Sequence, residues 1–114
     1  MTSSSVILLT LSSFSAAGGQ LLFKIGSHGK VQLLDFFNIQ IFLAFLLYGI
    51  GIIIWIYTLS FEKLVNVYAF TGLTFALVYL GGVFLLDETL NKLSFTGILL
   101  VCSGIYLMVA YGHE

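Results

Sequence analysis

The sequence predicts an all-α membrane protein, a four-transmembrane-helix bundle that forms a single membrane domain over residues 1–114. Hydrophobic residues make up 60% of the chain and charged residues only 8%, and a small soluble globule leaves too much of its surface in water to carry such a composition. Four apolar stretches, at about 6–25, 39–59, 65–86 and 93–111, each approach the roughly 20 residues that a helix needs to cross a hydrocarbon core of about 30 Å. The links after the second and third stretches are only a few residues long, which makes the helices that they join antiparallel.

The same composition excludes several other classes of protein. A net charge of −1 leaves no basic surface for nucleic acid, and one cysteine excludes a disulfide scaffold. The sequence contains no Ser-His-Asp set, no phosphate-binding loop and no pair of carboxylates within a span, and its two histidines, His28 and His113, stand far apart. We therefore expect no enzyme, no catalytic residue, no metal site, no cofactor and no nucleic-acid partner.

The first span, 6–25, is the polar one. On a helical wheel, Ser13, Gln20 and Lys24 share a face of small and polar residues, and large apolar side chains cover the opposite face. Small and hydroxyl residues also line the packing interfaces of membrane helices, but packing requires neither an amide nor an ammonium. We therefore predict that this face lines a substrate cavity. For Lys24 the alternative is a side chain that extends from the helix end to the lipid headgroups.

The two middle spans differ in polarity. The second, 39–59, carries almost nothing ionisable, and we expect it to act as a scaffold. The third, 65–86, begins with polar and aromatic residues that include Tyr68, and Asp87 and Glu88 follow its end. Carboxylates in a tight turn are usually solvated, and Asp87 can cap the next segment; the alternative is that Glu88 faces the cavity.

The fourth span, 93–111, carries one stripe of small and apolar residues: Gly97, Val101, Gly104 and Met108. Small residues one heptad apart allow two helices to approach closely. This contact could lie within one subunit or between two. We predict a dimer seam, because four short helices enclose little interior and a pathway for a substrate wider than an ion requires a second subunit.

Three segments of the chain resemble one family of transporters. Residues 17–24 read Ala-Gly-Gly-Gln-Leu-Leu-Phe-Lys, Tyr68 and Glu88 stand 20 residues apart, and Gly97 and Gly104 follow that glutamate by nine and sixteen residues. Together with the four short spans, this spacing resembles the four-helix branch of the drug/metabolite transporter superfamily. The chain is most similar to the small subunits that flip aminoarabinose-phosphoundecaprenol.

The resemblance implies a dimeric flippase-like translocator of a polyprenyl-phosphate-linked sugar, or of a similar lipid, that works by alternating access. Lys24 would pair with the phosphate, and Gln20, Ser13 and Tyr68 would bind the head group, while Glu88 would cap the cavity or hold Lys24 between cycles. The expected partner is a second copy of the chain or a similar small subunit. The expected location is the cell's inner (plasma) membrane, with several passes.

Two alternatives remain open at the level of sequence. The small multidrug resistance exporters are similar in size, in the tyrosine of the third span and in the glycine spacing of the fourth. They couple export to protons through a glutamate in the first helix, and Ala16 stands at that position here, so we expect no proton-driven export of cationic drugs. The other alternative is a non-transporting assembly subunit of a larger membrane enzyme, which would tolerate substitution of Gln20 and Lys24.

Overall fold

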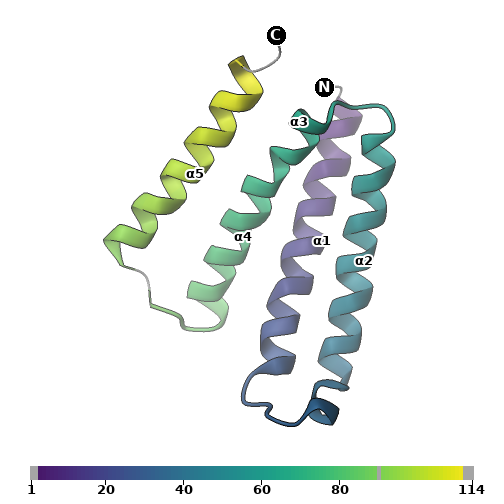
Figure 1. Cartoon of the computed structure of the whole chain (residues 1–114), viewed down its shortest axis with the longest axis vertical. Helices are drawn as coiled ribbons and strands as arrows, with labels where there is room; N and C mark the ends of the chain where they lie inside the picture. Colours follow the sequence, from purple (N-terminus) through teal and green to yellow (C-terminus); the bar gives the residue numbers. More distant parts are fainter. Residues whose placement is uncertain (1–2, 90, 112–114) are drawn as a thin grey trace.

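The computed structural model describes residues 3–89 and 91–111, and this part of the chain is helical without a strand (Figure 1). Its elements are α1 (Ser3–Ser27), η1 (Leu33–Phe36), α2 (Ile39–Leu59), α3 (Leu64–Tyr68), α4 (Phe70–Leu85) and α5 (Lys92–Tyr111). Three helical segments are long and apolar enough to cross a membrane: α1, α2, and α3 together with α4. The apolar stretch of α5, Lys92–Met108, is shorter. The prediction of an all-α protein with membrane-spanning helices is thus confirmed.

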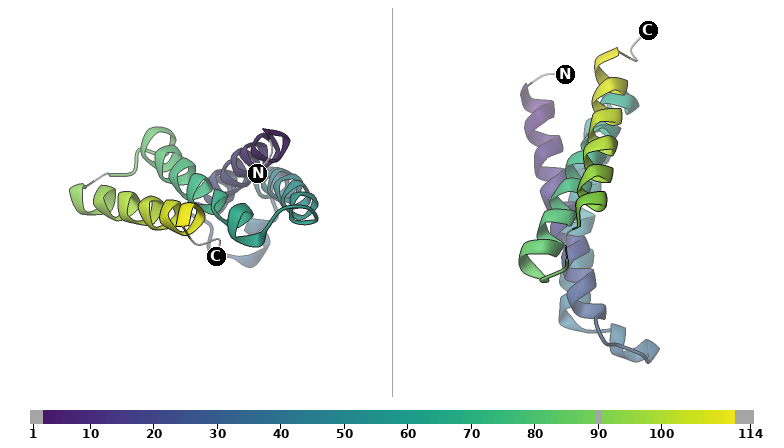
Figure 2. Two further views of the ribbon diagram at one scale, coloured as in Figure 1. Left: turned by 90° about the horizontal axis from the view of Figure 1, so that it is seen from above. Right: turned by 90° about the vertical axis from the view of Figure 1, so that its left-hand side faces the viewer.

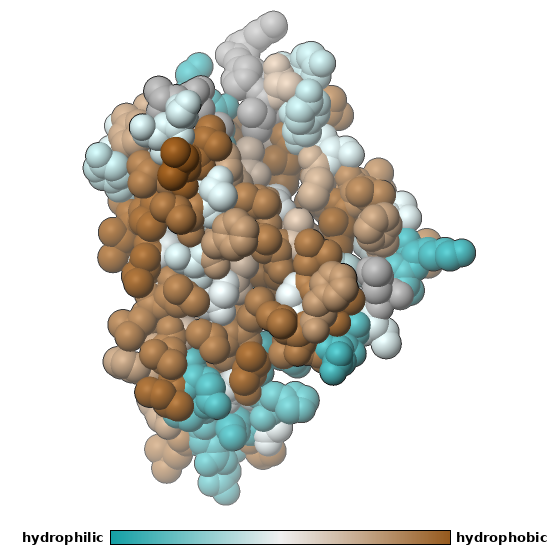
Figure 3. Space-filling model, turned by 180° about the vertical axis from the view of Figure 1, so that it is seen from behind, coloured by the Kyte–Doolittle hydropathy of each residue, from teal (hydrophilic) through white to brown (hydrophobic). Residues whose placement is uncertain are grey.

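Hydrophobic residues cover the middle of the face drawn in Figure 3, and hydrophilic residues gather near its upper and lower ends and at one side. Many of the largest apolar side chains point outward, including Phe14, Ile53 and Phe84, each more than half exposed. Such a surface is unfavourable in water and favourable in the hydrocarbon core of a bilayer. The packing interior is correspondingly small and consists mainly of small residues.

The start of α2 is fixed by Asn38. Its side-chain oxygen accepts a hydrogen bond from the Ile41 amide at 3.0 Å, as expected of an N-cap. Its amide nitrogen donates to the carbonyl oxygens of Gly26 at 2.9 Å and Asp35 at 3.0 Å. One side chain therefore joins the end of α1, the η1 segment and the start of α2.

Small residues repeat every seven positions on both helices of the α1–α2 hairpin and form its interface. The buried members are Ser5, Ser12, Gly19 and Gly26 on α1 and Ala44, Gly51 and Thr58 on α2. The Ser12 hydroxyl donates to the Gly51 carbonyl at 2.7 Å. A Cβ built on Gly51 would lie 2.9 Å from the Ser12 carbonyl oxygen, and one built on Gly19 would lie 2.9 Å from the Tyr48 Cβ. Glycine at these two positions is what allows the backbones to approach so closely.

This close approach gives a prediction about stability. We expect Gly51→Ala to lower the free energy of unfolding by about 1–3 kcal/mol, because the added methyl meets backbone that cannot turn aside. Gly49→Ala is the matched control on the same helix, since nothing lies within 4 Å of its Cβ position, and alanine is the better helix former by up to about 1 kcal/mol. Thermal unfolding in detergent measures both variants. Equal unfolding temperatures for the two would contradict the packing described above.

Helix α4 packs against α1, and α5 stands outermost. The Ser13 hydroxyl donates to the Phe70 carbonyl at 3.1 Å, and the side chain of Leu21 fills the space beside Gly81. These two contacts follow the same order along both helices, so α1 and α4 run parallel. Figure 2 shows α5 beside α4 and away from the α1–α2 hairpin. None of the α5 residues whose burial is described is buried, so this helix leaves most of its surface uncovered by the described part of the chain.

Candidate functional site

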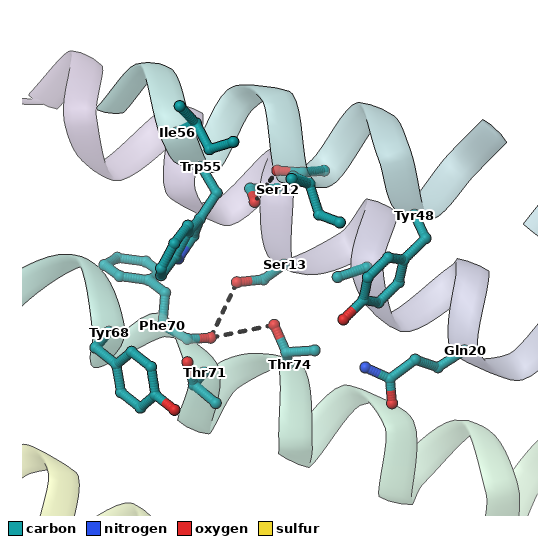
Figure 4. Close-up of a pocket in the computed structure, with 13 residues that line it drawn as sticks. Ser12, Ser13, Gln20, Tyr48, Trp55, Ile56, Tyr68, Phe70, Thr71 and Thr74 are labelled. Carbon is teal, nitrogen blue, oxygen red and sulfur yellow. Dashed lines mark hydrogen bonds between the residues drawn. The ribbon is translucent and has the colours of Figure 1, made fainter. Parts of the chain in front are cut away.

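A cavity of about 380 Å³ lies between α1, α2 and the start of the third span (Figure 4). Hydroxyl, amide and aromatic groups make up most of its wall: Ser12, Ser13, Gln20, Tyr48, Trp55, Tyr68, Phe70, Thr71 and Thr74. The α1 members of this wall fall in the middle of a 25-residue helix. The cavity is therefore placed within the span rather than at its end.

Hydrogen bonds divide the polar groups of the cavity into two kinds. The hydroxyls of Ser13 and Thr74 both donate to the Phe70 carbonyl, at 3.1 and 3.2 Å, so each keeps only lone pairs for a ligand. The amide of Gln20 and the hydroxyl of Tyr68 make no hydrogen bond to the described residues. The wall thus offers both acceptors and unengaged donors, which is what a ligand with several hydroxyl groups requires.

Aromatic rings form the other part of the wall. The Trp55 and Tyr68 rings meet edge to face with their centroids 6.5 Å apart, and Tyr48 lies across the cavity from them, nearer Gln20 (Figure 4). The sequence predicts the second span to be scaffold, and its small residues do pack on α1. The structure adds a second role, because Tyr48 and Trp55, three residues before and four residues after the packing residue Gly51, reach the cavity beside it. Their spacing of seven residues was the signal in the sequence that they share a face.

The electrostatic character of the cavity is neutral. No charged side chain is among the residues that line it in the described part of the chain. Ala16, which the resemblance to the exporters aligns with their glutamate, lies in the wall. An isolated ion is costly at this depth in a bilayer, so the arrangement suits an uncharged polar group.

The predicted site residues divide into two groups in the structure. Ser13, Gln20 and Tyr68 come together in the cavity. Lys24 is exposed one helical turn beyond Gln20 and does not line the cavity. Glu88 is also exposed and outside the cavity, and no ion pair joins it to Lys24 among the described residues.

The turn after α4 explains the position of Glu88. Asp87 has φ of 56°, in the left-handed region that aspartate tolerates better than most residues. The Glu88 amide then donates to the Gly82 carbonyl at 3.1 Å, and its carboxylate lies over Gly82, 3.0 Å from where a Cβ would stand. The sequence expectation that Glu88 caps the cavity or holds Lys24 is therefore not realised in this structure.

A second carboxylate, Glu62, has a structural partner that the sequence did not indicate. The Ser5 hydroxyl donates to its Oε1 at 2.8 Å, and Glu62 is half-buried in the turn after α2. The contact joins the beginning of α1 to the α2–α3 turn. Its partner Ser5 stands 15 residues before the cavity residue Gln20 on α1. Glu62 is therefore assigned to packing at the helix ends.

A second, smaller cavity of about 310 Å³ adjoins the first. It shares Gln20, Thr71 and Thr74 with the first cavity and is completed by Phe75, Val78 and Tyr79. Sequence reasoning missed Tyr79. It stands eight residues after Thr71 and four after Phe75, a helical spacing that places all three on one face of α4.

An apolar groove of about 930 Å³ lies at the end of the α1–α2 hairpin, beside η1. Its wall includes Phe23, Leu33, Phe36, Phe37, Phe42 and Phe45. The Phe23 ring contacts Phe45 in the groove, with centroids 5.0 Å apart, and Tyr48 in the cavity wall, at 6.1 Å. Groove and cavity are therefore neighbours along one side of the hairpin, separated by Phe23.

The glycine stripe of α5 has no partner within the described chain. Nothing lies within 4 Å of a Cβ built on Gly97 or Gly104, and Val101 and Met108 are exposed. Gly72 on α4, by contrast, would place its Cβ 2.8 Å from Ile105. The stripe therefore packs against no other helix in the described chain, and its role as a dimer seam stays a prediction.

Comparison of the chain with protein-family models, with curated proteins and with solved structures finds no match.

Proposed function

We propose that the chain is one subunit of a small dimeric transporter that moves a polyprenyl-phosphate-linked sugar, or a similar lipid, across the membrane by alternating access. In this proposal α5 is the fourth span of a four-helix bundle. One observation carries the proposal: a neutral cavity of hydroxyl, amide and aromatic groups lies within the span, and a free lysine follows one turn beyond its amide.

The cavity supplies what a sugar head group loses when it leaves water. A polar group that enters hydrocarbon without hydrogen bonds carries a large free-energy penalty. Gln20 and Tyr68 can donate to sugar oxygens, and the engaged hydroxyls of Ser13 and Thr74 can accept from sugar hydroxyls. The flat faces of Trp55 and the tyrosines provide the apolar wall that most ligand pockets combine with a few polar groups.

The remaining parts of such a lipid also find suitable surroundings. Lys24 is exposed at the end of the polar face, where an ammonium can meet a phosphate at the membrane boundary. The apolar groove beside Phe23 has the composition that a hydrocarbon chain favours. Sugar, phosphate and tail would then each contact a different part of the molecule along α1.

The main test is transbilayer movement of the lipid itself. We expect purified protein in liposomes to accelerate the movement of a polyprenyl-phosphate monosaccharide above the rate in protein-free liposomes. Oxidation of the exposed sugar by periodate, which does not cross the bilayer, measures the fraction in the outer leaflet over time. An unchanged rate, with correctly folded protein, would contradict the proposal and favour a non-transporting assembly subunit.

A second test addresses energy coupling. We expect no uptake of quaternary ammonium or guanidinium compounds when a pH gradient is imposed on the same liposomes, because no carboxylate is among the residues lining the cavity in the described chain. Aromatic rings can attract such cations, so binding alone does not decide the question. Gradient-driven accumulation would overturn the proposal in favour of a small-cation exporter.

A further inference from the structure

The hydroxyl of Tyr79 is buried and has no hydrogen-bond partner in the described chain. Buried hydroxyls are usually paired, because an unpaired one loses its bonds to water without replacement. Asn66 has the other such side-chain atom among the described residues, but it does not line either cavity of the site. Tyr79 also lines the second cavity. Its hydroxyl oxygen is itself covered, so a ligand in this cavity would reach it after a small shift of the ring or of the cavity wall.

The second cavity continues the first one along α4. The two share Gln20, and Figure 4 shows this side chain extending from α1 towards α4 below the hydroxyl groups of the first cavity. The parallel alignment of the helices places Gly81 beside Leu21, so Tyr79 lies at about the level of Gln20. The second cavity is therefore between the aromatic cavity and the end of α1 that carries Lys24.

We propose that the second cavity is the phosphate subsite of the transporter and that the Tyr79 hydroxyl donates a hydrogen bond to a phosphoryl oxygen of the lipid. This inference rests on the proposed function. In the lipid, the phosphate joins the sugar to the tail, and the second cavity lies between the cavity assigned to the sugar and Lys24, which is one helical turn beyond Gln20. The Lys24 ammonium would then offset the phosphate charge, which is costly without a counter-ion at this depth. The Gln20 amide and the Tyr79 hydroxyl are both unengaged donors at this place, and hydrogen bonds to an ionised oxygen are stronger than those between neutral groups.

A tyrosine that serves only to pack α4 behaves differently from one that binds a ligand. Tyr79→Phe retains the ring and removes only the unpaired hydroxyl, so the ligand-free variant should unfold at the wild-type temperature or above it. The same variant should bind polyprenyl phosphate about tenfold more weakly, because the charge-assisted bond is lost. Loss of binding with retained stability is a result that a packing role does not produce.

The experiment compares two probes and two variants. Binding of polyprenyl phosphate without a sugar, and of a neutral alkyl glucoside without a phosphate, is measured by thermal shift and by titration in detergent. Tyr57→Phe is the matched control, since Tyr57 is 61% exposed near the end of α2 and lines neither cavity. We expect Tyr79→Phe to weaken binding of the phosphate probe alone, and Tyr57→Phe to change neither.

Each other outcome has its own meaning. Weakened binding of the glucoside alone would assign the second cavity to the sugar and overturn the phosphate subsite. Wild-type binding of both probes by Tyr79→Phe would remove Tyr79 from the site while leaving the proposed function intact. If the wild-type protein binds neither probe, the proposed function itself fails, and the subsite fails with it.

Discussion

Replacing Lys24 with alanine is expected to weaken the binding of a polyprenyl phosphate to the purified protein by about ten- to a hundredfold. A charge-assisted hydrogen bond to phosphate contributes about 1.5–3 kcal/mol, and each 1.4 kcal/mol corresponds to roughly a tenfold change in affinity. Lys24 is exposed, and its side chain has no partner among the described residues. The ammonium is thus available to a ligand without first breaking a contact in the protein.

Three further variants separate phosphate binding from simple anchoring in the headgroup region. Lys24→Arg should retain much of the affinity, since either cation can hold a phosphate. Lys24→Gln keeps a polar side chain but loses the charge, so it should behave like alanine. Lys63→Ala removes an exposed lysine from the opposite end of the bundle and should have little effect. If Lys24→Gln binds and flips the lipid as the wild type does, at normal expression, the lysine serves only as an anchor.

Replacing both Gly97 and Gly104 with leucine is expected to separate the subunits in detergent. Within the described chain nothing occupies the space above either glycine, so the substitutions should leave the fold of one subunit intact. In a dimer joined along this stripe, two leucines on each α5 would hold the helices apart. Chemical crosslinking and the elution volume from size-exclusion chromatography measure the change.

Gly49→Leu is the matched control for the dimer seam. Its Cβ position is equally open, but it lies on α2 rather than α5. We expect Gly49→Leu to remain dimeric. The variant with both α5 substitutions should be monomeric, and its unfolding temperature should equal that of the wild-type monomer. An unchanged crosslinking yield and elution volume for the double α5 variant would place the seam elsewhere.

The sequence alone determines that the protein is all-helical with helices apolar enough to cross a membrane, and where most of these helices begin and end. The second span was predicted at about 39–59, and α2 has those bounds, because the length of an apolar run and the amide cap before it are local properties of the chain. The face that groups Ser13 with Gln20 was also readable, since a helical wheel depends only on residue order. Both residues, with Tyr68, line the observed cavity.

The tertiary structure alone decides which neighbour each face meets. The wheel places Ser12 and Ser13 about 100° apart but does not say which helix each of them meets. In the structure Ser12 bonds to Gly51 on α2 and Ser13 to Phe70 on α4. That division depends on how closely the α1 and α2 backbones approach, and the approach is set by glycines far apart in sequence. For the same reason, the sequence did not assign Tyr48 to the cavity.

The surroundings of Glu88, of Tyr79 and of α5 also depended on tertiary structure, because each is set by contacts between segments. Glu88 turns back over Gly82 because of a single left-handed residue in the preceding turn, which no apolar pattern specifies. The Tyr79 hydroxyl is buried without a partner among the described residues, which depends on how α4 packs in the folded chain. Sequence periodicity fixes the faces of a helix, whereas contacts between helices fix which of those faces packs, which binds and which, as on α5, remains open to a second chain.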